Sequence, residues 1–306
     1  MSPRPAMAAD DRTAIQHMAS RRWPQGWHPG GLGWWLARRQ LDDKPTPAVV
    51  VLDDPDGAVG AWATRGQHDE GEVSVQVDAG RDGMIDATLD WALDGLDGVR
   101  ITIEVYAGDT ASSTALEARG FAPDAGLPVV GMFRASGAPP PDETRGYRVR
   151  AVTDAELDDR VEVHRRAWKP ASLPWADGRT VDPDAESPFS RSAYDAVRST
   201  WLYRQELDLV AEAPDGSLAA CCIAWFDPAT GVAEIEPVGV DPTHRRRGLA
   251  VELCLEVARQ VEAIGGHELF LNVAPSPEYP ANAAAYAKAG FRVVQRGVNW
   301  VRPRAS

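Results

Sequence analysis

The sequence predicts an α/β protein made of two tandem domains that share one fold. A chain of 306 residues is long for a single domain and suits two of about 150 residues each. Near its middle, the proline-rich and aperiodic stretch ASGAPPPDETR is typical of a linker. The same order of strands, turns and helices can be read on either side of this stretch. We therefore predict a first domain at 1–136, a linker at 137–146 and a second domain at 147–306.

Each half begins with two apolar runs that flank a Pro-Asp-Gly turn, the pattern of a β-hairpin. These runs are 48–53 and 58–65 in the first half, and 207–213 and 217–226 in the second. Another strand, a helix, a strand, a short helix ending in Gly-Phe and a last strand follow in both halves. The sequence offset between equivalent turn residues increases along the chain, as small insertions into the second copy of a duplicated domain would produce. The equivalent pairs are Pro55 and Pro214, Gly83 and Gly248, and Gly120 and Gly290.

The clearest single element is the helix expected after Gly248. Its apolar residues recur at helical spacing, which predicts one face packed on a sheet. Gly265-Gly266 supplies a stop. The residues of this apolar stripe are Leu249, Leu253, Val257, Val261 and Ile264.

Composition excludes several functional classes. The net charge of −13 argues against nonspecific binding to nucleic acid. No run of about 18 apolar residues is present, so we expect no membrane span. The first residues, MSPRPAMAADD, lack the apolar core of a secretory signal. Cys221, Cys222 and Cys254 form neither a disulfide framework nor a metal-ligand spacing. We expect a cytoplasmic protein without a metal site.

A possible anion site lies at the turn in AEIEPVGVDPTHRRRGLA (233–250). Asp241-Pro242 ends a strand, and three arginines and Gly248 lead into the helix. Amides at a helix start are unpaired and carry positive potential, which suits a diphosphate. Gly248 would let the ligand approach the backbone, and the side chains of Arg245, Arg246 and Arg247 would add charge-assisted contacts. The alternative is a solvated charge run between a strand and a helix.

This turn resembles the signature of the GCN5-related N-acetyltransferase (GNAT) superfamily. Arg245-x-x-Gly248-x-Ala250 fits its pattern Arg/Gln-x-x-Gly-x-Gly/Ala, and Val238-Gly239-Val240 precedes it as the end of the fourth strand. Tyr286 and Gly290-Phe291 resemble the second motif, Tyr-x-x-x-Gly-Phe. The resemblance covers about 147–303, and the first half only by element order. It implies two tandem GNAT-like domains, each a mostly antiparallel sheet flanked by helices, a layout similar to that of mycothiol synthases.

The resemblance also implies how acetyl-CoA would bind. Backbone groups of the Val238-Gly239-Val240 strand end would hold the pantetheine arm like an added strand. Amides of Arg246, Arg247, Gly248, Leu249 and Ala250 would hold the pyrophosphate. Family members often place an asparagine seven residues before the motif tyrosine, where this chain has Tyr279. Asn282, four residues before Tyr286, is then the candidate asparagine.

By the same resemblance, an amine attacks the acyl thioester directly in a ternary complex. Glu234 lies where histone-type members place their catalytic base, eleven residues before Arg245. Glu236 shares its strand face by period two, unless Pro237 introduces a bulge, so either glutamate is a candidate. Both could instead lie on a solvated strand face. The Val238 amide could stabilise the oxyanion, and Tyr286, otherwise a core aromatic residue, could protonate the leaving thiolate.

The first half lacks the side chains for this chemistry. At the equivalent turn, Val77–Gly83, Asp78 and Asp82 would repel a diphosphate, and only Arg81 could attract one. Leu116 stands where the second half has Tyr286, and leucine donates no proton. We predict a degenerate first copy, although backbone amides alone could still bind CoA.

The expected function is transfer of an acetyl group from acetyl-CoA to a small-molecule primary amine. Two alternatives remain, a non-catalytic acyl-CoA sensor and an aminoacyl-tRNA-dependent transferase with a tandem fold. The intact turn and the charge of −13 speak against the second. Lys169–Ser192, between two helices that border the acceptor site in the family, is expected to be a lid or a mobile loop.

Overall fold

A computed structural model describes residues 3–6, 9–39, 49–65, 70–96, 98–139, 146–273 and 275–304. Contacts divide the chain into two compact units, Met1–Val130 with Gln295–Ser306, and Gly131–Val294. Residues 131–136, at the end of the predicted first domain, belong to the second unit. Residues 295–306, at the end of the predicted second domain, belong to the first unit. The part of the predicted linker at 140–145 lies outside the described residues.

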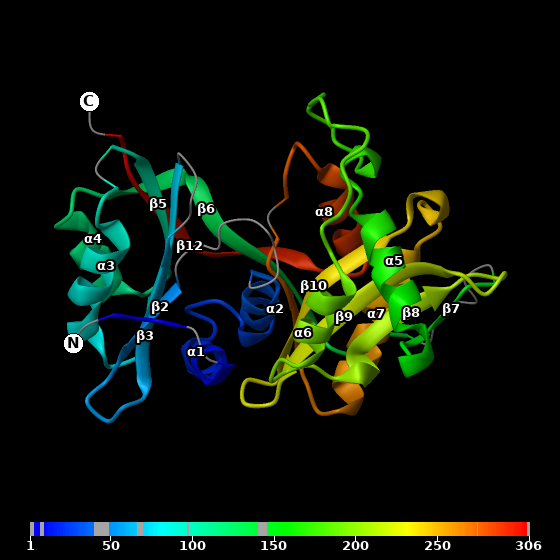
Figure 1. The fold of residues 1–306 in the computed structure, drawn as a ribbon, viewed down its shortest axis with the longest axis horizontal. Coiled ribbons are helices and arrows are strands. Elements are labelled where there is room, and N and C mark those ends of the chain that lie inside the picture. The colour runs from blue at the N-terminus through cyan, green and yellow to red at the C-terminus, as the bar shows by residue number, and fades with distance from the viewer. Residues whose placement is uncertain are drawn as a thin grey trace. The chain divides into compact units, whose positions relative to one another are not determined.

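The first unit is a sheet with helices on both faces (Figure 1). Its strands are ordered β1-β2-β3-β4-β5-β12, and neighbours are antiparallel except for the parallel pair β4 and β5. Apolar residues of α1 and α2 pack with Val51 and Trp62, whereas those of α3 and α4 pack with Leu52 and Ile101. The elements are β1 (Arg4–Pro5), α1 (Ala9–Arg22), α2 (Pro29–Arg39), β2 (Val49–Asp53), β3 (Val59–Arg65), β4 (Glu70–Val77), η1 (Asp82–Met84), α3 (Ile85–Leu93), β5 (Arg100–Tyr106), α4 (Thr110–Glu117) and β12 (Arg292–Arg302).

The second unit repeats this arrangement. Its strands are ordered β7-β8-β9-β10-β11-β6, again antiparallel except for the pair β10 and β11. Helices α5 and α7 cover opposite faces of β8–β10 (Figure 1). The elements are β6 (Ala122–Ala135), β7 (Arg148–Ala151), η2 (Asp154–Glu156), α5 (Leu157–Ala167), η3 (Pro170–Ser172), α6 (Arg191–Arg198), η4 (Gln205–Leu207), β8 (Asp208–Glu212), β9 (Leu218–Asp227), β10 (Val232–Val240), η5 (Pro242–His244), α7 (Leu249–Ala263), β11 (Glu268–Leu271) and α8 (Pro280–Lys288).

The last strand of each half completes the sheet that belongs to the other half. Met132–Ala135 of β6 pairs with β11, and Gly297–Arg302 of β12 pairs with β5. Pairing satisfies backbone groups that an open strand edge would leave exposed. The predicted fold class, two mostly antiparallel sheets flanked by helices, is confirmed.

Helix α7 forms much of the core of the second unit. Leu249, Leu253, Val257 and Val261 are each at most 2% exposed, and burial of one such side chain stabilises a fold by about 1.5–3 kcal/mol. The predicted stripe is wrong at Ile264, which is 37% exposed. The helix ends at Ala263, so Ile264 has left the helical face that contacts the sheet.

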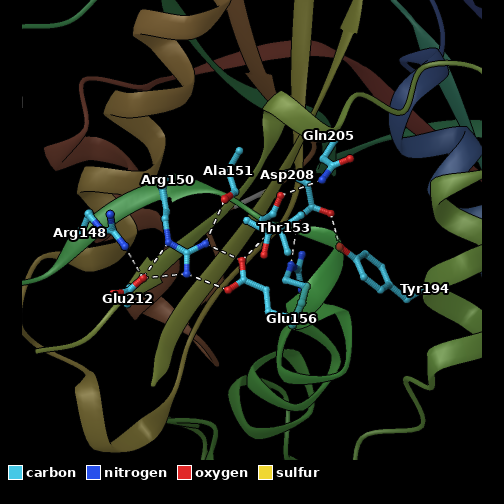
Figure 2. A network of polar contacts seen from close by, with 11 residues as sticks. Arg148, Arg150, Ala151, Thr153, Glu156, Tyr194, Gln205, Asp208 and Glu212 are labelled. Atoms are coloured by element: carbon cyan, nitrogen blue, oxygen red, sulfur yellow. Dashed lines mark hydrogen bonds and ion pairs between the residues drawn. The ribbon is translucent and has the colours of Figure 1, made fainter. Parts of the chain in front are cut away.

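A polar network fixes α5 and α6 to strand β8 (Figure 2). The Nε of Arg160 donates to Asp208 Oδ1 at 2.9 Å, and the Tyr194 hydroxyl donates to Asp208 Oδ2 at 2.6 Å. Arg160 and Asp208 are completely buried. At the start of α5, Arg150 pairs with Glu156 and with Glu212 of β8 (Figure 2). These contacts hold α5 and α6 against the sheet.

Candidate active site

A cavity of about 1020 Å³ opens in the second unit where two parallel strands separate. β10 and β11 pair only from Val232–Glu234 to Glu268–Phe270. Beyond that point Glu236–Val240 line one side of the cavity and Leu271–Val273 line the other. An unpaired strand edge offers main-chain groups to an extended ligand. The start of α7, the end of α5 and one side of α8 form the remaining walls.

The turn into α7 has the conformation that its sequence predicts. Gly248 is the N-cap residue at φ +88°, a left-handed backbone that glycine adopts without strain. Asp241 fixes the turn, because its Oδ1 accepts hydrogen bonds from the amide and hydroxyl of Thr243, at 2.9 and 2.7 Å. Burial alone would raise the pKa of Asp241, but the hydrogen bonds from Arg166 and Thr243 lower it. The first amides of α7 therefore begin at a rigid turn at the cavity wall.

The three consecutive arginines lie in different surroundings. Arg245 lines the cavity, but its guanidinium donates to main-chain oxygens of Val240, Ala167 and Ser172. Arg246 also lines the cavity and is exposed. Arg247 lies outside the lining, and its guanidinium stands 5.9 Å from the ring centre of Tyr147. The turn therefore brings one exposed arginine, Arg246, to the cavity.

A β-bulge separates the two candidate glutamates. Ile235 pairs with Ala224 and Val238 with Cys222, so Glu236 and Pro237 together oppose one residue of β9. Proline has no N–H, so its place in the bulge leaves no donor unpaired. Glu236 lines the cavity, whereas Glu234 is 2% exposed and lies outside the lining.

Tyr286 and Asn282 both lie in the cavity wall formed by α8. Burial, and to a lesser degree the nearby Cys254 and the carboxylate of Glu236, raise the pKa of Tyr286 well above its ordinary value. Its hydroxyl therefore keeps its proton at neutral pH. The Asn282 side-chain oxygen accepts a hydrogen bond from the Ala283 amide at 2.5 Å.

Several lining residues were not among the predicted site residues. Trp168 packs directly over Gly239, where an added Cβ would come 2.1 Å from the indole. A glycine within a strand can indicate such a close approach, so Val-Gly-Val was a sequence signal for a close neighbour at this position. Tyr279 lines the cavity and its ring lies 5.7 Å from that of Trp175. Asn272 and Lys288, also in the lining, had no sequence signal.

At the equivalent position, the described residues of the first unit enclose a far smaller space. Its strands β4 and β5 also separate, but the cavity there measures about 10 Å³, roughly the space of one water molecule. Arg22 and Gln25, next to the end of α1, lie in its lining. At the equivalent turn Asp78 pairs with Arg21 at 2.5 Å, and Arg81 pairs with Asp54 at 2.8 Å. Arg81 is therefore already neutralised.

Comparison with known proteins supports the sequence resemblance. Residues 173–291 match the model of the acetyltransferase (GNAT) family. This segment is a GNAT domain. GNAT acetyltransferases take their acyl group from acyl-CoA. The match therefore indicates an acyltransferase that uses acyl-CoA as its co-substrate. No curated protein sequence matches the chain significantly.

Solved structures extend the similarity of fold to both halves. A GCN5-related N-acetyltransferase from Sphaerobacter thermophilus is 21% identical with a TM-score of 0.53, over 99% of this chain and 96% of that one. A tandem GNAT protein from the clavulanic acid biosynthesis pathway is 15% identical with a TM-score of 0.53, over 100% and 98%. FemX is 10% identical with a TM-score of 0.55, over 98% and 97%. At these identities the likeness shows the fold alone.

Two kinds of feature are absent from the described residues. None of their helices is long and apolar enough to cross a membrane. They include no group of three or more His, Cys, Asp or Glu side chains arranged to hold a metal ion.

Proposed function

We propose that this protein is an N-acyltransferase that moves an acetyl group from acetyl-CoA to a small-molecule primary amine. The observation that carries the proposal is one cavity of about 1020 Å³. Its lining includes the start of α7, the unpaired edge of β10, the carboxylate of Glu236 and the protonated hydroxyl of Tyr286. Each of these parts meets one need of the reaction.

Acetyl-CoA would lie along the open edge of β10. Main-chain groups of Val238 and Val240 would hold the pantetheine arm as a neighbouring strand does. The amides of residues 246–250 and the dipole of α7 would hold the diphosphate, together with the exposed guanidinium of Arg246. Asn282 lies on the opposite wall, within the same cavity.

Glu236 would act as the base, directly or through a water molecule. An amine with a pKa near ~10 is mostly protonated at neutral pH, so a proton must leave before attack. The free amine then forms a bond to the thioester carbonyl carbon, and the Val238 amide stabilises the oxyanion. When the carbon–sulfur bond breaks, Tyr286 protonates the thiolate and regains a proton from the attacking nitrogen, which loses its second proton as the amide forms. Glu236 is preferred to Glu234 because it lines the cavity.

Calorimetric titration with acetyl-CoA and with CoA tests the binding step. Wild type should bind both ligands, and Gly248→Asp should weaken binding more than about tenfold, since it adds a β-carbon and a negative charge at the diphosphate turn. Gly57→Asp is the matched control. Gly57 also has a left-handed backbone, at φ +82°, with no atom within 4 Å of an added Cβ, and lies in a turn of the first unit. Failure of wild type to bind either ligand would overturn the proposal.

Release of CoA thiol across a library of amines then tests catalysis. The protein's own three cysteines are buried, and burial raises the pKa of Cys221 to about 11 and that of Cys254 to about 12. They should therefore contribute little to a thiol reagent signal at pH 8. Binding of acetyl-CoA without thiol release for any amine would instead indicate a sensor.

A further inference from the structure

Arg245 anchors a segment that crosses one side of the cavity. The segment Lys169–Arg179 follows α5, and its residues Leu173 and Pro174 line the cavity next to Trp168. Arg245 donates to the main-chain oxygens of Ala167 and Ser172. These two oxygens belong to the residues immediately before Trp168 and Leu173, so each contact fixes the backbone beside a lining side chain.

The other end of the segment is attached to the chain before α8. The Ala176 amide donates to the main-chain oxygen of Glu278 at 2.8 Å. Arg179 forms an ion pair with the Glu278 carboxylate, and its guanidinium lies 4.1 Å from the ring centre of Trp175. The segment therefore bridges the α7 turn and the start of α8, with Leu173 and Pro174 between its two attachments.

The segment follows α5, which packs on the face of the sheet opposite α7, the helix expected to hold the diphosphate. Helix α5 and helix α7 pack on opposite faces of β9 and β10 (Figure 1). If the turn into α7 and the edge of β10 are occupied by acetyl-CoA, Trp168, Leu173 and Pro174 form the wall left for the amine.

We propose that Arg245 is a positioning residue that ties the acceptor-side wall to the turn holding the cofactor. The acceptor and cofactor roles in this inference rest on the proposed function, whereas the hydrogen bonds of Arg245 do not depend on it. Three of the five guanidinium N–H groups are committed to main-chain oxygens from α5, η3 and β10. Occupation of the turn then restrains the wall through Arg245, so acetyl-CoA orders the acceptor side before the amine enters.

Hydrogen–deuterium exchange measured amide by amide tests the anchor. In free Arg245→Ala, the amides of Ser172, Leu173 and Trp175 should exchange at least about tenfold faster than in wild type, because their backbone loses its anchor. Arg245→Lys, which can donate to part of the same set, should restore part of the protection. Arg165→Ala is the matched control. It removes an arginine from α5 whose ion pair is with Glu162, outside the cavity.

The coupling is tested by repeating the exchange with saturating acetyl-CoA. Wild type and Arg165→Ala should gain protection at Ser172–Trp175, whereas Arg245→Ala should bind acetyl-CoA within about threefold of wild type and gain none.

Unchanged exchange in free Arg245→Ala would overturn the anchor. A more than tenfold loss of affinity with retained protection would make Arg245 a phosphate ligand instead. If Arg245→Ala fails to fold, Arg245→Lys alone decides, by intermediate or unchanged exchange. If wild type does not bind acetyl-CoA, the proposed function fails while exchange in the free protein still decides the anchor.

Discussion

The indole Nε1 of Trp225 donates a 2.6 Å hydrogen bond to the main-chain oxygen of Glu236 across the β-bulge. The bulge takes this carbonyl out of the regular ladder between β9 and β10, and the indole satisfies it. The contact thereby fixes the backbone from which the Glu236 side chain and the Val238 amide project.

Trp225→Phe keeps an aromatic ring but removes the donor. A carbonyl that loses its partner costs about 1–3 kcal/mol, so the bulge should relax and kcat should fall about tenfold, equivalent to about 1.4 kcal/mol. Affinity for acetyl-CoA, measured by calorimetry, should change little. Trp201→Phe is the control, since Trp201 is 37% exposed and outside the cavity lining. Equal kcat in the two variants would remove Trp225 from the positioning of Glu236.

The same isosteric substitution, glutamate to glutamine, distinguishes the roles of Glu234 and Glu236. Glu236→Gln removes the proposed base and should lower kcat about 10²–10⁴-fold, with little effect on acetyl-CoA affinity. Glu234→Gln alters a buried residue outside the cavity, so it should act mainly on the free energy of unfolding. A larger loss of kcat in Glu234→Gln than in Glu236→Gln would assign the base to Glu234.

Tyr286→Phe should lower kcat about 10²-fold, the lower end of the range for loss of a general acid, while acetyl-CoA affinity stays near wild type. A general acid acts in its protonated form, and burial raises the pKa of Tyr286 above its ordinary value. The active form is therefore present at neutral pH and is lost only as pH rises through that raised pKa. In wild type, kcat should show no decline caused by Tyr286 up to about pH 10. An alkaline decline near pH 9 that Tyr286→Phe abolishes would contradict this.

Asp208→Ala should be the most destabilising change in the polar network of Figure 2. It leaves the fully buried Arg160 guanidinium without its counter-charge, at a cost of about 3–5 kcal/mol. Glu212→Ala also removes ion pairs, to Arg148 and Arg150, but these lie near the solvent and should matter much less. Urea unfolding compares the two variants. Equal losses would show that the buried pair adds nothing beyond a surface pair.

Local sequence patterns determined the elements of this protein and one part of its site. The hairpins, the α7 stripe up to Val261 and the turn at Gly248 all appear where the periodicity and turn residues predict them. Tyr286 lies in the cavity wall at the spacing that the motif implied. Such features depend on residues close together in the chain, so each can be read without knowing the whole fold.

Tertiary structure alone decided how these elements combine. Two copies with the same pattern offer two equivalent last strands, and only the folded chain shows that β12 completes the sheet of β5 while β6 completes that of β11. Glu236 rather than Glu234 lines the cavity, because β10 stays paired with β11 through Glu234 and the two strands separate only beyond it. Arg245 is committed to carbonyls more than 70 residues away in sequence, at Ala167 and Ser172. Long-range contacts of this kind leave no local periodicity, so the sequence reveals that the residues exist but not which groups they meet.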